Sequence, residues 1–291
     1  ANGLVSENGV IKLVTNTGTI KASDIKIDAG EKGEATISGT IEANSTVSKG
    51  GDIEITGKEL NLVSANLSAD GKTGGGTILV GGDWQGKGDL FQSTYTSIDK
   101  NSALSASALE SGAGGTIVAW SNIKDSNSVT SVYGTLSAKG IDGDGGQIET
   151  SGAVLNYNGI KVNTSSLIGN YGNWLLDPTD ITIGSSEAST IASNLGTSDV
   201  TQTADNTITV NNNIAYTGAR NATLTFNATT LVLGANITSS NGSLSVDVNA
   251  ALKLNTDVTV TTNSGSFDVS GAISPNSTSV SGILQLKRSG A

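Results

Sequence analysis

Two aspartates near a tryptophan are the residues in this 291-residue sequence that most resemble catalytic groups. Asp177 and Asp180 are paired carboxylates close to Trp174, and glycoside hydrolases use two carboxyl groups that flank the scissile bond. Many polysaccharide-cleaving enzymes rely on several clustered acids, or on calcium with a basic residue, in a groove. We therefore favour a structural role for Asp177 and keep catalysis near Asp177 or Asp142 as an alternative.

A second acidic segment carries alternating carboxylates. Asp142 and Asp144 stand on either side of Gly143, and alternate carboxylates can meet one hard cation such as calcium. The segment lacks the downstream Glu of an EF-hand and is not repeated in nonapeptide fashion. It predicts a tight turn, and the sequence predicts no metal site and no cofactor.

The residue types that are missing exclude much enzyme chemistry. The chain has no Cys, His or Met and only two Arg, Arg220 and Arg288. Thiol nucleophiles, disulfides, Ser-His-Asp triads and most zinc sites are therefore excluded. We predict that the protein is not an enzyme.

Aromatic side chains are the best candidates for ligand contacts, because an aromatic ring presents an apolar face edged by polar groups. The candidate ligand-binding residues are Trp84, Phe91, Tyr95 and Trp120, of which the first three lie in one long interruption of the strand pattern. The competing interpretation is that Trp84 and Trp120 only cover the fold where a loop leaves it.

The charge balance limits the partners. A formal net charge of −10 and a pI near 4.4 disfavour nucleic acid, which is bound through basic side chains. No polybasic segment and no run of 18 apolar residues is present, so we expect no membrane insertion. We expect a monomer.

The elements that would position these residues are short strands. Apolar residues alternate with small polar ones in runs such as Ile53–Thr56, Thr77–Val80 and Thr207–Val210. One short helix is expected, Ser186–Asn194, with Ser186 as its cap.

A repeated phrase distinguishes a solenoid from other all-β folds. Gly-Gly-x-Ile recurs with its isoleucines at Ile53, Ile78, Ile117 and Ile148. Coils that stack on one another would bury these inward side chains. The pattern predicts an all-β, right-handed parallel β-helix with loop excursions and at most one short helix.

Two regions of the β-helix differ in composition. Residues 1–176 are expected to form Gly-rich coils with an inserted loop near residues 83–112, and a second excursion is expected at residues 122–131. Residues 177–291 are expected to continue the β-helix with shorter, Asn- and Thr-rich coils. Asparagines in successive coils can form hydrogen-bonded ladders.

Three ordered phrases resemble the filamentous haemagglutinin family of large exoproteins. They are Gly74-Gly75-Gly76-Thr77-Ile78-Leu79-Val80-Gly81-Gly82-Asp83-Trp84, Gly114-Gly115-Thr116-Ile117-Val118-Ala119-Trp120 and Gly143-Asp144-Gly145-Gly146-Gln147-Ile148-Glu149-Thr150-Ser151-Gly152. A fourth, Asn173-Trp174-Leu175-Leu176-Asp177-Pro178, is similar to another phrase of that family. The Asn-Pro-Asn-type motif of the family's secretion domain is absent, so the chain is expected to be an internal or C-terminal segment.

This resemblance implies an adhesin exported by two-partner secretion. The implied partners are host-cell glycans or exopolysaccharide, together with an Omp85-type outer-membrane transporter that acts through a region outside this chain. The implied location is the cell surface or the medium of a Gram-negative bacterium. Two alternatives stay open: a carbohydrate-active β-helix acting on an acidic polysaccharide, and a passive stalk that carries a separate binding domain.

Overall fold

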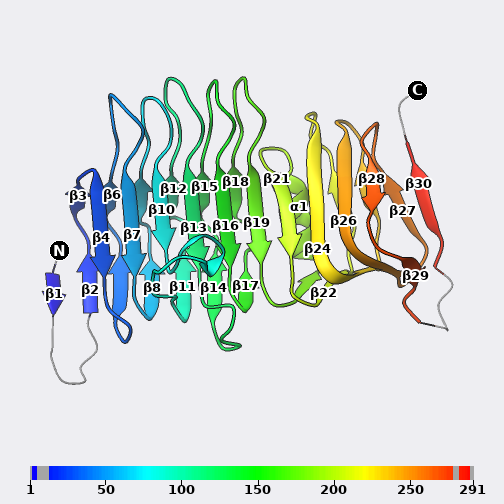
Figure 1. Ribbon diagram of the computed structural model, residues 1–291, viewed down its shortest axis with the longest axis horizontal. Helices are drawn as coiled ribbons and strands as arrows, with labels where there is room; N and C mark the ends of the chain where they lie inside the picture. Colours follow the sequence, from blue (N-terminus) through cyan, green and yellow to red (C-terminus); the bar gives the residue numbers. More distant parts are fainter. Residues whose placement is uncertain (1, 5–12, 278–281, 289–291) are drawn as a thin grey trace. The chain divides into compact units, whose positions relative to one another are not determined.

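The protein is a parallel β-helix made of short strands. The computed structural model describes residues 2–4, 13–277 and 282–288, with about 48% strand and 5% helix (Figure 1). Parallel strands form stacked sheets, so the predicted all-β, parallel β-helix class is confirmed. The chain divides into two compact units, unit 1 (Ala1–Trp174) and unit 2 (Leu175–Ala291).

Unit 1 has three sheets, and each coil of the chain contributes one strand to each sheet. Sheet A contains β1 (Asn2–Leu4), β2 (Leu13–Asn16), β5 (Glu34–Ile37), β8 (Glu59–Leu62), β11 (Tyr95–Ile98), β14 (Val129–Val132) and β17 (Val154–Asn156). Sheet B contains β3 (Thr19–Lys21), β6 (Thr40–Glu42), β9 (Asn66–Ser68), β12 (Ala103–Ser105), β15 (Thr135–Ser137) and β18 (Lys161–Asn163). Sheet C contains β4 (Asp24–Asp28), β7 (Asp52–Thr56), β10 (Thr77–Val80), β13 (Thr116–Trp120) and β16 (Gln147–Ser151). Strand β1 is antiparallel to β2, and β19 (Asn173–Asp177) crosses the division between the units.

The core of unit 1 is built from columns of identical positions in successive coils. In sheet C, the register aligns Ile25, Ile53, Ile78, Ile117 and Ile148. All five side chains are buried. Stacked apolar side chains at period two remove the inward face of every coil from water, which is the main stabilisation available to a solenoid.

The glycine pairs of the repeated phrase bring the chain back onto sheet C after each loop. The second glycine of each pair donates its N–H to the alanine at which the loop leaves: Gly51 to Ala43, Gly76 to Ala69, Gly115 to Ala106 and Gly146 to Ala138, at 2.7–2.8 Å. A Cβ on Gly115 would lie 2.0 Å from the carbonyl oxygen of Gly76 in the coil below. The repeated glycine pairs are therefore explained by close backbone contact between successive coils.

Unit 2 uses longer strands. Its large sheet contains β20 (Ile181–Ile183), β21 (Asp199–Thr203), β22 (Thr207–Val210), β24 (Ala222–Leu233), β26 (Leu244–Leu254), β28 (Phe267–Val269) and β29 (Ile273–Pro275). The 12-residue strand β24 pairs with β21 through its first part and with β22 through its last part. A four-stranded sheet contains β23 (Ile214–Tyr216), β25 (Ile237–Ser239), β27 (Val258–Thr261) and β30 (Leu284–Lys287).

Asparagine side chains connect successive coils of unit 2, as expected from its composition. Asn249 Nδ2 donates to Asn227 Oδ1 at 2.9 Å, and Asn276 Nδ2 donates to Asn255 Oδ1 at 3.2 Å. In a second ladder the Asn236 N–H donates to Asn213 Oδ1 at 2.9 Å. These bonds satisfy outward polar groups at the same position of each coil.

The expected helix is present in unit 2 as α1 (Ser185–Asn194), with different capping. Gly184, and not Ser186, occupies the N-cap, and the Glu187 carboxylate accepts the Gly184 N–H at 3.1 Å. Ile191 and Leu195 are fully buried. Within the described residues, no helix is long and apolar enough to cross a membrane.

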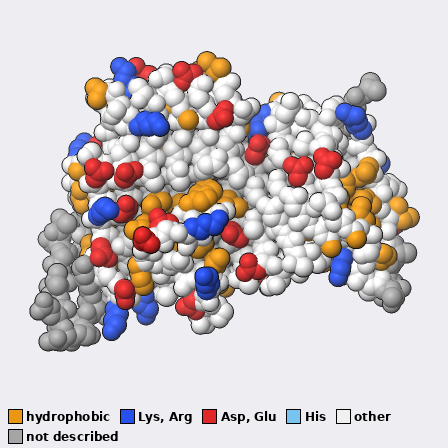
Figure 2. Space-filling model, viewed as in Figure 1, with side chains coloured by type: hydrophobic (Ala, Val, Ile, Leu, Met, Phe, Trp, Pro, Cys, Tyr) orange, Lys and Arg blue, Asp and Glu red, His pale blue; other side chains and the backbone are white. Residues whose placement is uncertain are grey.

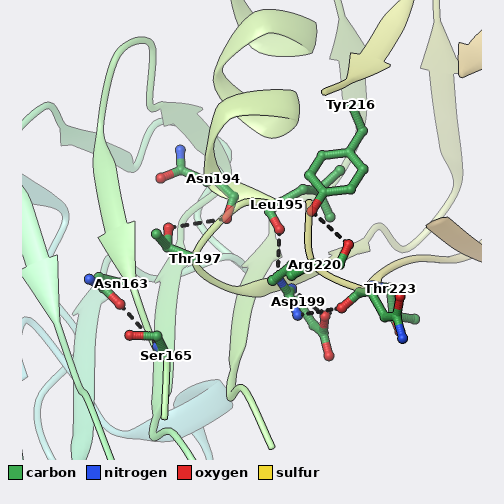
Figure 3. A network of polar contacts seen from close by, with 10 residues as sticks. Asn163, Ser165, Asn194, Leu195, Thr197, Asp199, Tyr216, Arg220 and Thr223 are labelled. Carbon is green, nitrogen blue, oxygen red and sulfur yellow. Dashed lines mark hydrogen bonds and ion pairs between the residues drawn. The ribbon is translucent and has the colours of Figure 1, made fainter. Parts of the chain in front are cut away.

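A charged network fixes the C-terminal end of α1 within unit 2 (Figure 3). The Arg220 guanidinium donates to the Leu195 carbonyl at 2.7 Å and to the Asp199 carboxylate at 2.5 Å. Asp199 also accepts the Thr223 N–H at 2.9 Å, and the Tyr216 hydroxyl donates to the Arg220 carbonyl at 2.9 Å. The Arg220 side chain is only 15% exposed, so the network is largely shielded from water.

Candidate functional site

A loop of unit 1 folds back over the outer face of sheet C. This cover loop, residues 81–94, leaves after β10, contains the 3-10 helix η1 (Trp84–Gly86) and returns at β11. The inserted loop expected near residues 83–112 is therefore too long, because β11 and β12 pair in register with β8 and β9. The excursion expected at residues 122–131 also ends sooner, at β14, which begins at Val129.

The cover loop explains why side chains on the outer face of sheet C are inaccessible. Val118 on β13 and Glu149 on β16 alternate with the inward isoleucines and therefore point outward, yet both are fully buried. On uncovered strands of the same sheet the equivalent positions carry Lys26 and Glu54, which form an exposed ion pair at 2.9 Å. The outward positions of sheet C are therefore accessible to water away from the cover loop and buried beneath it.

Glu149 is the main polar attachment of the cover loop. Its Oε2 accepts the Gln85 N–H at 2.7 Å, and its Oε1 accepts the Ser151 hydroxyl at 3.0 Å. Gln85 has φ 55° and ψ 23°, a left-handed conformation that costs a non-glycine residue free energy. The hydrogen bond from the Gln85 N–H to this buried carboxyl group supplies the compensating interaction.

Trp120 lies beneath the loop and is almost fully buried. Its indole N–H donates to Gln92 Oε1 at 3.1 Å. A Cβ on Gly82 or Gly86 would lie 2.5 Å from atoms of the indole ring, so only glycine lets the loop backbone lie on this ring. Trp120 therefore has no face to offer a ligand, and the prediction that it contacts one is wrong.

Trp84 and Phe91 remain partly exposed on the cover loop. Figure 2 shows hydrophobic side chains grouped on the side of the molecule where sheet C lies, with Lys and acidic side chains next to them. The loop itself is closed by Asp83, whose carboxylate accepts the Leu90 N–H at 2.9 Å. These two aromatics can make apolar contacts with a partner.

Tyr95 lies apart from this face, on β11 of sheet A, where it lines a groove of about 400 Å³. The groove is also lined by Lys58, Glu59, Thr94, Asp125 and Asn127. It forms where the cover loop and the 122–128 excursion both return to sheet A. The sequence indicated both excursions but not that their ends meet, because that depends on the register of β11 with β14.

The acidic segments singled out in the sequence have structural partners. Asp142 accepts the Gly112 N–H, and Asp144 accepts the Asn170 N–H at 2.8 Å, so both tie neighbouring loops of unit 1 together. Asp180 accepts the Thr207 N–H at 3.1 Å in unit 2. Trp174 is fully buried in unit 1, with its indole N–H on the Thr150 hydroxyl at 3.0 Å. This tryptophan therefore offers no face to a sugar.

Asp99 in unit 1 and Asp247 in unit 2 have shifted pKa values. Burial opposes ionisation of Asp99 in unit 1, but hydrogen bonds from the Ser102 hydroxyl and from the N–H groups of Ser64, Asn101 and Ser102 outweigh it and lower the pKa. Burial, and then repulsion by Asp268 on the adjacent strand, raise the pKa of Asp247 in unit 2. Among the described residues, no group of three or more acids is placed to hold a metal ion.

Comparison with known proteins adds no functional assignment. No protein-family model matches the chain, and no curated protein matches it. The class of protein defined here is therefore the parallel β-helix, and the resemblance to filamentous haemagglutinin-like exoproteins stays a prediction.

Proposed function

We propose that the chain is a structural and adhesive segment of a secreted or surface-exposed bacterial exoprotein. It attaches the bacterium to host-cell glycans or to exopolysaccharide and performs no catalysis. The export route is two-partner secretion, through an Omp85-type transporter that recognises a region outside this chain. The basis for family and export is the resemblance of the Gly-Gly-x-Ile and Leu-Leu-Asp-Pro phrases.

The observation that carries the adhesive role is the cover loop. A solenoid needs only its inward columns for stability, yet unit 1 holds a strained loop over sheet C through Glu149 and Trp120. The result is that Trp84 and Phe91 are held half-exposed on a rigid surface. Preorganised aromatic side chains lose little conformational entropy on binding, which favours affinity. Weak contacts of this kind become strong when many copies act together.

The proposal is tested by binding of the whole chain to an array of glycans and to exopolysaccharide. We expect saturable binding that Trp84→Ala weakens by about 2- to 13-fold, the loss that corresponds to one aromatic contact. Tyr133→Ala is the matched control, because Tyr133 is an exposed aromatic that follows β14 and lies outside the cover loop. The Tyr133→Ala variant is expected to bind as wild type does.

Two results would contradict this function. Folded protein that binds no glycan, polysaccharide or cell surface would favour the passive stalk. Release of reducing ends or unsaturated products from an acidic polysaccharide would favour the enzyme.

A further inference from the structure

We propose that the groove around Tyr95 binds a neutral pyranose sugar. The inference rests on the proposed glycan adhesion and names the sugar class and a second contact site, separate from Trp84. The groove has a volume of about 400 Å³, within the range of small-molecule sites.

The walls of the groove are fixed by backbone hydrogen bonds to the β-helix. The N–H groups of Thr94 and Tyr95 both donate to the Lys58 carbonyl, at 2.9 and 3.2 Å. On the other wall, the Asn122 N–H donates to the Ser93 carbonyl at 2.8 Å, and the Val129 N–H donates to the Thr94 carbonyl at 3.0 Å. A site held in this way needs little reorganisation on binding.

The groove offers both donors and acceptors around one aromatic ring. In the described part of the protein, no hydrogen bond or ion pair engages the side chains of Lys58, Glu59 or Tyr95. The Lys58 ammonium donates and the Glu59 carboxylate accepts, and the Thr94 hydroxyl can only accept, because its proton is donated to the Lys58 carbonyl at 3.1 Å. A ring that carries several hydroxyl groups and apolar C–H faces matches this combination.

The charge of the groove selects among sugars. Glu59 and Asp125 outnumber Lys58, and the whole chain carries a net charge of −10. Uronic acids and sulfated sugars would meet two carboxylates against one ammonium, so they would be repelled. Neutral hexoses pay no such cost, and carboxylates accept hydrogen bonds from vicinal hydroxyl groups.

The test is titration of the whole chain with neutral oligosaccharides of glucose, galactose and mannose, and with oligosaccharides of galacturonic acid, followed by calorimetry. We expect at least one neutral series to bind, and to bind at least tenfold more tightly than the acidic series. Tyr95→Ala is expected to weaken this binding about 2- to 13-fold, whereas Tyr95→Phe, which keeps the ring, stays within about threefold of wild type.

Tyr133→Ala is again the matched control, and circular dichroism checks that every variant folds. The inference is overturned if no neutral sugar binds, if the acidic series binds more tightly, or if Tyr95→Ala binds like wild type. If Trp84-dependent adhesion persists while the groove binds no neutral sugar, this inference fails and the proposed function stands. If the groove binds sugar but the chain shows no Trp84-dependent adhesion, the proposed role of the cover loop fails instead.

Discussion

Units 1 and 2 have the same fold and differ in the side chains that bridge their coils. In unit 1, paired glycines bring backbone against backbone, as where Gly115 lies on Gly76. In unit 2, Asn side chains bridge the coils, as from Asn249 to Asn227. Close backbone contact also occurs in unit 2, where a Cβ on Gly242 would lie 2.1 Å from the carbonyl oxygen of Arg220, so the Asn ladders add to this contact and do not replace it.

The two units differ in the length of chain that lies between hydrogen-bonded positions of neighbouring coils. Hydrogen bonds between coils join residues 35 and 37 positions apart around Asp99 and Ser102 of unit 1, but 21 and 22 apart in the Asn ladders of unit 2. The glycine closures let long loops leave unit 1 and return to a fixed point. Unit 1 therefore accommodates longer loops between paired strands than the Asn ladders of unit 2 span.

The largest expected effect is on the backbone contact of unit 1. Gly115→Ala places a Cβ 2.0 Å from the Gly76 oxygen and should destabilise unit 1 by about 3 kcal/mol or more. Trp84, Trp120 and Trp174 all lie in unit 1, so urea unfolding followed by tryptophan fluorescence reports this unit.

Gly18→Ala is the control for this substitution. No atom lies within 4 Å of a Cβ at Gly18, although it is a turn glycine of the same unit. Its unfolding midpoint should stay near that of wild type. Equal midpoints for the two variants would show that backbone contact does not close the coils.

In unit 2 the corresponding test removes a side-chain network. Arg220→Ala leaves Asp199 and the Leu195 carbonyl without their charged donor and should destabilise unit 2 by about 2–3 kcal/mol. The loss should appear in far-UV circular dichroism with little change in tryptophan fluorescence. Arg288→Ala, at an exposed position, is the control and should have no effect. A tryptophan-fluorescence midpoint that falls together with the dichroism midpoint would contradict a loss of stability confined to unit 2.

A smaller effect of opposite sign is expected at Gln202. This side chain is fully buried on β21, and its amide atoms have no hydrogen-bond partner among the described residues. Gln202→Leu should therefore raise the stability of unit 2 by about 1 kcal/mol in thermal unfolding. A loss of stability would indicate that the amide is satisfied in solution.

The smallest effects concern pH, with opposite signs in the two units. The lowered pKa of Asp99 gives unit 1 stability that is present above about pH 4 and is lost on acidification. The raised pKa of Asp247 makes unit 2 lose stability as the pH rises from about 4 through the folded pKa. Asp99→Asn and Asp247→Asn should each flatten the pH dependence of their own unit. If the stability of both units changed with pH in the same direction, these pKa shifts would be contradicted.

The sequence predicts what repeats and fails where the chain departs from the repeat. The isoleucine column and the Gly-Gly phrase predict the β-helix because each coil must bury the same inward position. For Trp120 the sequence leaves ligand contact and a covering role both open, since an outward position on β13 becomes internal only after the cover loop folds onto it. The groove lined by Lys58 and Asp125 was missed because it joins ends of loops that are distant in sequence.

The proposed location of the binding surface is the cover loop of unit 1. It is tested most directly by adhesion of the whole chain to its glycan target with the double variant Trp84→Ala and Phe91→Ala. Phe267→Ala, which removes a partly exposed aromatic from β28 of unit 2, is the matched comparison. We expect the double variant to adhere more weakly than wild type and Phe267→Ala to adhere as wild type does. Full adhesion by the folded double variant, or loss of adhesion in Phe267→Ala, would contradict this location.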